Sequence, residues 1–109
     1  MTVSEMVGAL GLQEATAARP AEVSGAIASD LISDVLANGR PGQVWLTIQT
    51  HRNVAAVASA QSLAAVVLTG GRTPGEDLLA LAETEQVTVL LSEEETFAVA
   101  GRLYALGVR

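Results

Sequence analysis

Short apolar runs alternate with longer amphipathic stretches along most of the chain. From residue 44 onward the apolar runs recur about every 15 to 20 residues, which is typical of strands joined by helices in right-handed βαβ units. The run 64–68 is almost continuously apolar, as expected for a parallel strand buried on both faces. The pattern therefore predicts a three-layer α/β/α fold with a mostly parallel sheet of about five strands, including Val23–Ala28, Val44–Ile48, Ala64–Leu68 and Val87–Leu91.

The segment before residue 29 has a weaker pattern. Residues 12–18 fit either a short strand or an extended arm, and Pro20 then breaks the chain. Gly25 lies inside a predicted strand, where it indicates a bulge or a close backbone approach. Residues 12–28 could therefore add antiparallel pairings at one edge of the sheet.

Capping residues and glycines mark the ends of five expected helices. The first helix is Glu5–Leu10, with Ser4 as its N-cap and a stop at Gly11, and the second is Leu31–Ala37, with Ser29 or Asp30 before it and a left-handed Asn38–Gly39 cap after it. The third is His51–Ala60, with Thr50 as its N-cap, and the fourth runs from about Pro74 to Thr84. The last helix begins with a Ser92–Glu95 capping box and ends at Gly107. Apolar spacing predicts the buried faces of three of these helices. The second helix buries Leu31, Val35 and Leu36, the third buries Val54, Val57 and Ala58, and the last buries Phe97, Ala100, Leu103 and Tyr104.

The composition excludes several classes of function but does not by itself indicate one. A chain of 109 residues allows a single domain, spanning 1–109. The absence of cysteine excludes disulfides and thiolate chemistry, and all six basic residues are Arg. The net charge of −6 argues against binding to nucleic acid or to an anionic membrane. Without a leader pattern or a long apolar run, we expect a cytoplasmic protein.

The core must be built largely from small and aliphatic side chains. Half of the residues are apolar and nineteen are Ala, whereas Trp45, Phe97 and Tyr104 are the only aromatic residues. We expect Trp45 to lie in the core or at a dimer contact, with ligand stacking as the alternative. A small chain this rich in apolar residues leaves apolar surface for a partner, so we expect a homo-oligomer, most simply a dimer.

Candidate binding residues follow from the predicted topology. In open α/β sheets, ligands bind beyond the carboxyl ends of the strands, where helix N-termini present free N–H groups. The polar residues at those positions include Asp30, Gln49, Thr50, His51, Asn53, Gly70, Gly71, Arg72 and Ser92. If the strands are parallel neighbours, these residues converge on one edge of the sheet.

Each of these candidates also has a purely structural interpretation. The segment TGGRT fits an anion site, with two exposed glycine N–H groups and the Arg72 fork, but it also fits a simple turn. His51 could contact a ligand or could be an exposed first-turn residue. A single histidine makes a metal site improbable, and no catalytic residue or cofactor is expected, because the common nucleotide-binding and hydrolase motifs are all absent.

The segment SGAIASDLISDVLANGRPGQVWLTIQTHRNVAAVA, residues 24–58, resembles the DRTGG domain family. VSEMVGALGL, AAVVLTGGRTP and AGRLYALG are also similar, so the likeness covers nearly the whole chain. The stretch that names the family falls on residues 22–26, where only Gly25 is retained literally. The resemblance implies a candidate binding site at the residues that match the patterned segments of the family. These residues are Asp30, Gln49, Thr50, His51 and Asn53.

The resemblance implies a regulatory module without catalysis, with a fold similar to the N-terminal domain of HPr kinase. Family members occur in long phosphotransacetylases and between CBS domains of regulated pyrophosphatases, where adenine nucleotides are sensed. Stand-alone members resemble proteins labelled serine kinase, and some are encoded near iron-only hydrogenase subunits. A kinase activity is not expected here, because the chain lacks a phosphate-binding loop and its lysine.

Two functions of different kinds follow. The first is a ligand-sensing module, most simply a homodimer, that binds an adenine nucleotide or another anion at the sheet edge. The second is an adaptor subunit for a larger enzyme or signalling protein, with an exposed apolar patch and edge residues already bonded within the chain. An enzyme ranks third.

Overall fold

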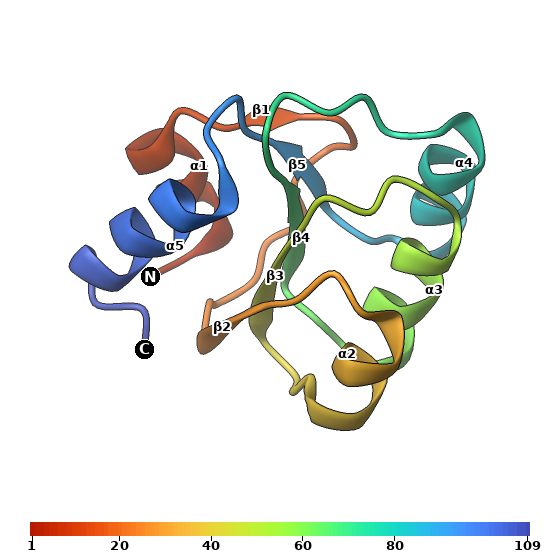
Figure 1. The fold of residues 1–109 in the computed structure, drawn as a ribbon, viewed down its shortest axis with the longest axis horizontal. Helices are drawn as coiled ribbons and strands as arrows, with labels where there is room; N and C mark the ends of the chain where they lie inside the picture. The colour runs from red at the N-terminus through yellow and green to blue at the C-terminus, as the bar shows by residue number, and fades with distance from the viewer.

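The computed structural model describes residues 1–109, in which one five-stranded sheet lies between two layers of helices (Figure 1). The strand order is β1-β5-β4-β3-β2, with β1 antiparallel and the other four strands parallel. The strands are β1 Gln13–Glu14, β2 Gly25–Ala28, β3 Gln43–Thr47, β4 Ala65–Leu68 and β5 Val89–Leu91. The predicted α/β class and the mostly parallel sheet are confirmed, and of the undecided residues 12–28 only β1 pairs antiparallel, since β2 is parallel to β3.

Each face of the sheet has its own set of helices. Successive parallel strands advance one position in the same direction, so connections of the same handedness place α2, α3 and α4 on one face, and α1 and α5 cover the other (Figure 1). The helices are α1 Val3–Leu10, α2 Ile32–Asn38, α3 Asn53–Ala60, α4 Glu76–Glu85 and α5 Thr96–Ala105.

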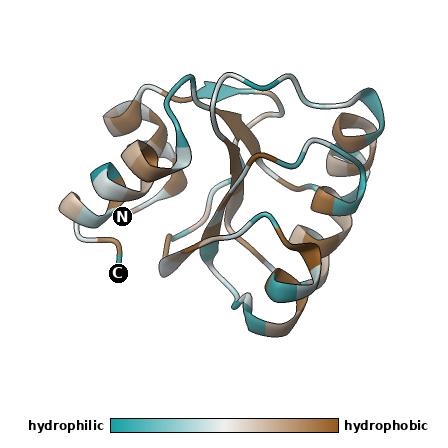
Figure 2. Ribbon diagram, viewed as in Figure 1, coloured by the Kyte–Doolittle hydropathy of each residue, from teal (hydrophilic) through white to brown (hydrophobic).

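The sheet separates two hydrophobic cores. Its central strands are apolar (Figure 2). Neighbouring residues of a strand point to opposite faces, so Trp45 packs under α2–α4 whereas Val44 and Leu46 pack under α1 and α5. Trp45 is fully buried, and its indole Nε1 donates to the Ser29 carbonyl at 2.7 Å. Trp45 is therefore a core residue rather than a dimer contact.

Residues 15–24 form an extended segment that joins β1 to β2. Side chains and backbone tie it to other elements: the Thr16 hydroxyl bonds to β5, the Arg19 N–H donates to the Thr88 hydroxyl at 2.9 Å, and Glu22 forms a bridge with Thr2. Only Gln13–Glu14 of the ambiguous stretch 12–18 is a strand. The strand expected at 23–28 begins at Gly25.

Several helices begin later or earlier than expected. Thr2, not Ser4, caps α1, and it forms a capping box with Glu5. The helix α3 begins at Asn53 after an Arg52 N-cap, so Thr50 does not cap it. Ser29 and Asp30 do not cap α2 either, because its N-cap is Leu31. The predicted Ser92–Glu95 capping box is wrong: α5 begins at Thr96, and the Ser92 hydroxyl accepts from the Glu94 N–H in the preceding turn.

Two helix faces also differ from the expectation. In α2 only Val35 is buried, while Leu31 and Leu36 are exposed, and Gly39 is extended rather than left-handed. In α5 the sheet-facing residues are Val99 and Leu103, with Ala100 partly buried beside them, whereas Phe97 and Tyr104 are exposed. The reason is that α5 carries apolar residues on nearly every side, so periodicity could not select the buried face.

The capping box of α1 gives a testable prediction. Thr2→Ala removes the hydroxyl that accepts from the Glu5 N–H at 3.1 Å, and we expect it to lower the free energy of unfolding by about 1 kcal/mol in denaturant titrations. Hydrogen bonding to the backbone N–H and then to the side chain of Thr2 lowers the pKa of Glu5. The stabilisation by Glu5 is therefore present above its ordinary pKa and is lost as the pH falls through the lowered value. An unchanged unfolding midpoint in Thr2→Ala would contradict this role.

Candidate functional site

The four parallel strands end at one edge of the sheet, and all nine predicted binding residues lie there. They fall into two groups rather than one. Asp30, Gln49, Thr50, His51 and Asn53 follow β2 and β3, and Gly70, Gly71, Arg72 and Ser92 follow β4 and β5. No group of three or more His, Asp or Glu side chains is placed to hold a metal ion.

Asp30 and Gln49 hold two neighbouring turns together. One carboxylate oxygen of Asp30 accepts from the Thr47 hydroxyl and from the Ile48 N–H, both at 2.9 Å. The Gln49 side-chain amide donates to the Asp30 carbonyl at 2.9 Å. These two residues are thus already bonded within the chain, which ties the end of β2 to the end of β3.

The TGGRT loop is bonded in the same way. The Gly70 N–H donates to the Glu94 carbonyl at 2.7 Å, and the Gly71 N–H donates to the Ser92 carbonyl at 2.9 Å. Both glycines have positive φ, of 74° and 69°, a conformation that favours glycine. Arg72 folds back and donates to the Thr69 carbonyl at 3.1 Å. The expectation that the two glycines expose their N–H groups to an anion is therefore wrong.

Gly71, Arg72 and Ser92 line a cleft of about 300 Å³, together with Glu93. Glu93 lies directly over the loop, because a Cβ at Gly71 would be only 2.5 Å from a Glu93 carboxylate oxygen. A carboxylate in this position repels a bound anion. The cleft brings three predicted residues together, but the Glu93 carboxylate offsets the charge of Arg72, the only basic residue that lines it.

The N-terminus of α3 leaves several backbone N–H groups unpaired at this edge. The backbone N–H groups of His51, Arg52 and Asn53 have no hydrogen-bond partner in the chain, and all three residues are exposed. The Thr50 carbonyl accepts from the Gly75 N–H at 2.9 Å and fixes the turn that leads into the helix. This turn presents an imidazole, a guanidinium and three free donors to solvent.

The charges around the other helix N-termini differ. The first turns of α2 and α4 carry acidic residues, and Glu93, Glu94 and Glu95 immediately precede α5. The first turn of α3 has none. Arg52 borders a shallow cleft with Asp77 of α4, but no ion pair joins the two side chains. The first turn of α3 therefore carries fewer acidic residues than those of α2 and α4, and the Asp77 carboxylate lies beside the turn that leads into it.

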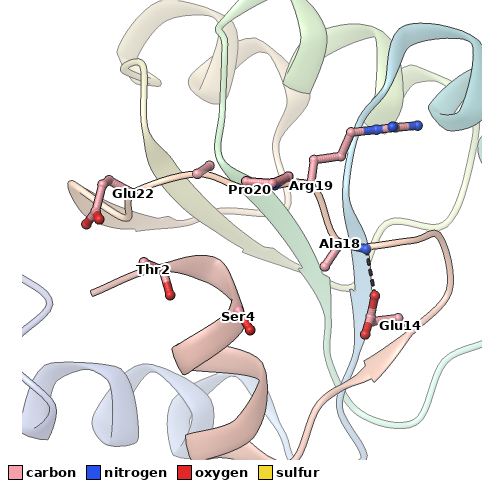
Figure 3. Close-up of a pocket in the computed structure, with 8 residues that line it drawn as sticks. Thr2, Ser4, Glu14, Ala18, Arg19, Pro20 and Glu22 are labelled. Carbon is pink, nitrogen blue, oxygen red and sulfur yellow. Dashed lines mark hydrogen bonds between the residues drawn. The ribbon is translucent and has the colours of Figure 1, made fainter.

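The largest cleft of the molecule was not predicted from the sequence. It has a volume of about 590 Å³ and lies between the first turn of α1 and residues 14–22 (Figure 3). Thr2 and Ser4 contribute hydroxyls, and Glu14 and Glu22 contribute carboxylates, whereas the Arg19 side chain extends away from α1. One oxygen of Glu14 accepts from the Ala18 N–H at 2.6 Å. No sequence motif marks this cleft, because it forms between segments joined only by tertiary contacts.

Comparisons with known proteins identify the family. A solved structure of the CBS and DRTGG domains of the regulatory region of Clostridium perfringens pyrophosphatase, complexed with its activator diadenosine tetraphosphate, has the same fold, with a TM-score of 0.72 at 12% identity. The match covers 94% of this chain but only 45% of that one. No curated protein matches the chain in sequence. The model of the DRTGG domain matches residues 15–106, so the chain belongs to the DRTGG domain family.

Proposed function

We propose that this chain is a regulatory module that binds an adenine nucleotide or a similar phosphate-bearing anion at the N-terminus of α3. The observation that carries the proposal is the open N-terminus of α3. His51 and Arg52 in the turn before the helix, and Asn53 at its start, each have an unpaired backbone N–H group, and the first helical turn carries no acidic residue. Free N–H groups at a helix N-terminus favour phosphate, and an arginine fork adds charge-assisted hydrogen bonds.

The comparison supports a regulatory role for this fold. The similar pyrophosphatase region carries an adenine dinucleotide as its activator, although it is about twice as long as this chain. A nucleotide bound by this chain would act on a larger enzyme or signalling protein, since the chain contains neither a phosphate-binding loop nor a lysine for phosphoryl transfer. None of the helices has both the length and the apolar character of a membrane-spanning segment. We keep the expectation of a cytoplasmic location as part of this proposal.

The alternative is an adaptor without a small ligand. It is favoured by the internal bonding of the sheet edge, since Asp30, Gln49, Gly70 and Gly71 already satisfy one another or their neighbours. An adaptor needs no free donors at this edge. The two functions differ in one measurable property, namely the binding of a nucleotide to the isolated chain.

Calorimetric titration with ATP, AMP, diadenosine tetraphosphate and inorganic phosphate separates the two functions. We expect an adenine nucleotide to bind, and we expect Arg52→Ala to weaken its binding at least about tenfold, because a charge-assisted contact to phosphate is lost. Arg40→Ala is the matched control, because Arg40 is also exposed but lies in the turn before β3, at the opposite edge of the sheet.

His51→Ala is expected to weaken binding to a smaller extent than Arg52→Ala, because an imidazole offers fewer hydrogen-bond donors to a phosphate than the planar guanidinium fork does. If no compound binds the wild-type chain, or if Arg40→Ala and Arg52→Ala lose affinity equally, the α3 site is contradicted. The first of these results also makes the adaptor function the better account.

A further inference from the structure

The cleft lined by Arg72 and Glu93 lies where the chain changes from one face of the sheet to the other. The strand β4 leads into α4, which covers one face, and β5 leads into α5, which covers the opposite face (Figure 1). In α/β proteins, ligands bind beyond the carboxyl ends of the strands where neighbouring connections leave toward opposite faces. The cleft is lined by residues of the loops after both strands, so it occupies that place in the fold.

Backbone hydrogen bonds fix the two loops relative to each other. The N–H groups of Gly70 and Gly71 donate to carbonyls of the loop after β5, at 2.7 and 2.9 Å. Gly71 also leaves space for the Glu93 carboxylate, since a Cβ at Gly71 would be 2.5 Å from one of its oxygens. The walls of the cleft are therefore set before a ligand enters, which lowers the entropic cost of binding.

One basic and one acidic side chain line the cleft without pairing with each other. Arg72 donates from Nη1 to the Thr69 carbonyl at 3.1 Å, and its other guanidinium nitrogens remain free to donate. Neither of the two ion pairs of the chain involves Arg72 or Glu93. Glu95 also lies close to Gly70, but it does not line the cleft. The cleft thus offers a set of cationic donors and an anionic acceptor to the same ligand.

The size and the charges of the cleft limit what it can hold. Its volume of about 300 Å³ is at the lower end of the range of about 300–1,000 Å³ that is usual for small-molecule sites. A ligand with a single charge would be attracted by one of the two side chains and repelled by the other. The cleft therefore fits a small ligand that carries both a positive and a negative group.

We propose that this cleft binds a free α-amino acid. The carboxylate of the amino acid accepts hydrogen bonds from the Arg72 guanidinium, and its ammonium group donates to the Glu93 carboxylate. A zwitterion has no net charge, so the net charge of −6 of the chain does not repel it as it repels a phosphate. The site lies after β4 and β5, apart from the proposed nucleotide site after β3, so either site can exist without the other.

A ¹⁵N–¹H correlation spectrum of the chain, recorded with each common L-amino acid at millimolar concentration, tests the proposal. We expect at least one amino acid to shift the amides of residues 71–73 and 92–93 and to leave those of residues 51–53 unchanged. The N-acetyl derivative and the amide of that amino acid each lack one of the two charges. Both should bind at least about tenfold more weakly, because each loses one charge-assisted contact.

Two variants test the two charged side chains separately. Arg72→Gln and Glu93→Gln should each weaken amino-acid binding at least about tenfold. Arg40→Gln and Glu83→Gln are the matched controls, because both residues are exposed and neither lines the cleft. Arg52→Ala should also leave this binding unchanged, so a failure of the nucleotide site does not affect the result.

Three results would overturn the proposal. The first is that no amino acid shifts the amides around the cleft. The second is that the N-acetyl derivative or the amide binds as tightly as the free amino acid, which would indicate a site for a singly charged ligand. The third is that binding persists unchanged in both Arg72→Gln and Glu93→Gln.

Discussion

The free energy of unfolding is expected to fall by about 3–5 kcal/mol when Trp45 is replaced by Ala. Trp45 is the largest fully buried side chain and packs in the core beneath α2, α3 and α4. Its removal leaves a large cavity among aliphatic residues, and it also leaves the Ser29 carbonyl without the indole donor. Because small domains are stable by only about 5–15 kcal/mol, this variant lies close to the limit of folding.

Trp45→Phe separates the two contributions. Phenylalanine fills most of the cavity but cannot donate to Ser29, so we expect a loss between that of wild type and that of Trp45→Ala. Unfolding of all three proteins can be followed by circular dichroism in denaturant. Trp45 is the only tryptophan, so its fluorescence in the wild type reports independently on the same core. Equal stability of Trp45→Ala and wild type would show that the Trp45 environment is not part of the folded core.

The second large effect is expected for Thr16→Val, which should lower the free energy of unfolding by about 2–3 kcal/mol. The buried Thr16 hydroxyl donates to the Val87 carbonyl at 3.0 Å and accepts from the Val89 N–H at 2.9 Å. Valine has nearly the same shape, so no cavity forms. The cost arises because a buried N–H and a buried carbonyl lose their partner.

Thr16→Ser is the matched control for this prediction. Serine retains the hydroxyl and both hydrogen bonds, and loses only a methyl group, so it should cost about 1 kcal/mol or less. The comparison of Val with Ser in thermal or denaturant unfolding isolates the polar contribution. If valine is as stable as threonine, or more stable, the two hydrogen bonds do not hold residues 15–24 on β5.

The strands were predictable because their signal is local. The run 64–68 is apolar at every position, and the structure places β4 at Ala65–Leu68, fully buried. Helix faces were less predictable where apolar residues surround the helix. In α5 the spacing of Phe97 and Tyr104 is as regular as that of Val99 and Leu103, and only packing on the sheet decides which pair is buried.

The candidate site was also predictable only in part. The predicted topology placed every candidate after a parallel strand, and the structure has all of them at the carboxyl ends of the strands. The sequence could not predict whether the N–H groups of the TGGRT loop are free or hydrogen-bonded, because their acceptors lie more than twenty residues away in the turn after β5. The start of α3 at Asn53 leaves residues 51–52 in the turn before the helix, and no capping residue in the sequence marks that start.

The proposed binding of a nucleotide phosphate at the N-terminus of α3 has one most direct test. This test is a ¹⁵N–¹H correlation spectrum of the wild-type chain, recorded during titration with diadenosine tetraphosphate and, separately, with ATP. We predict that the amides of residues 51–53 shift first and furthest, because their N–H groups lack partners in the free chain. Spectra that do not change, or that change only around Gly71 and Glu93, would contradict the claim.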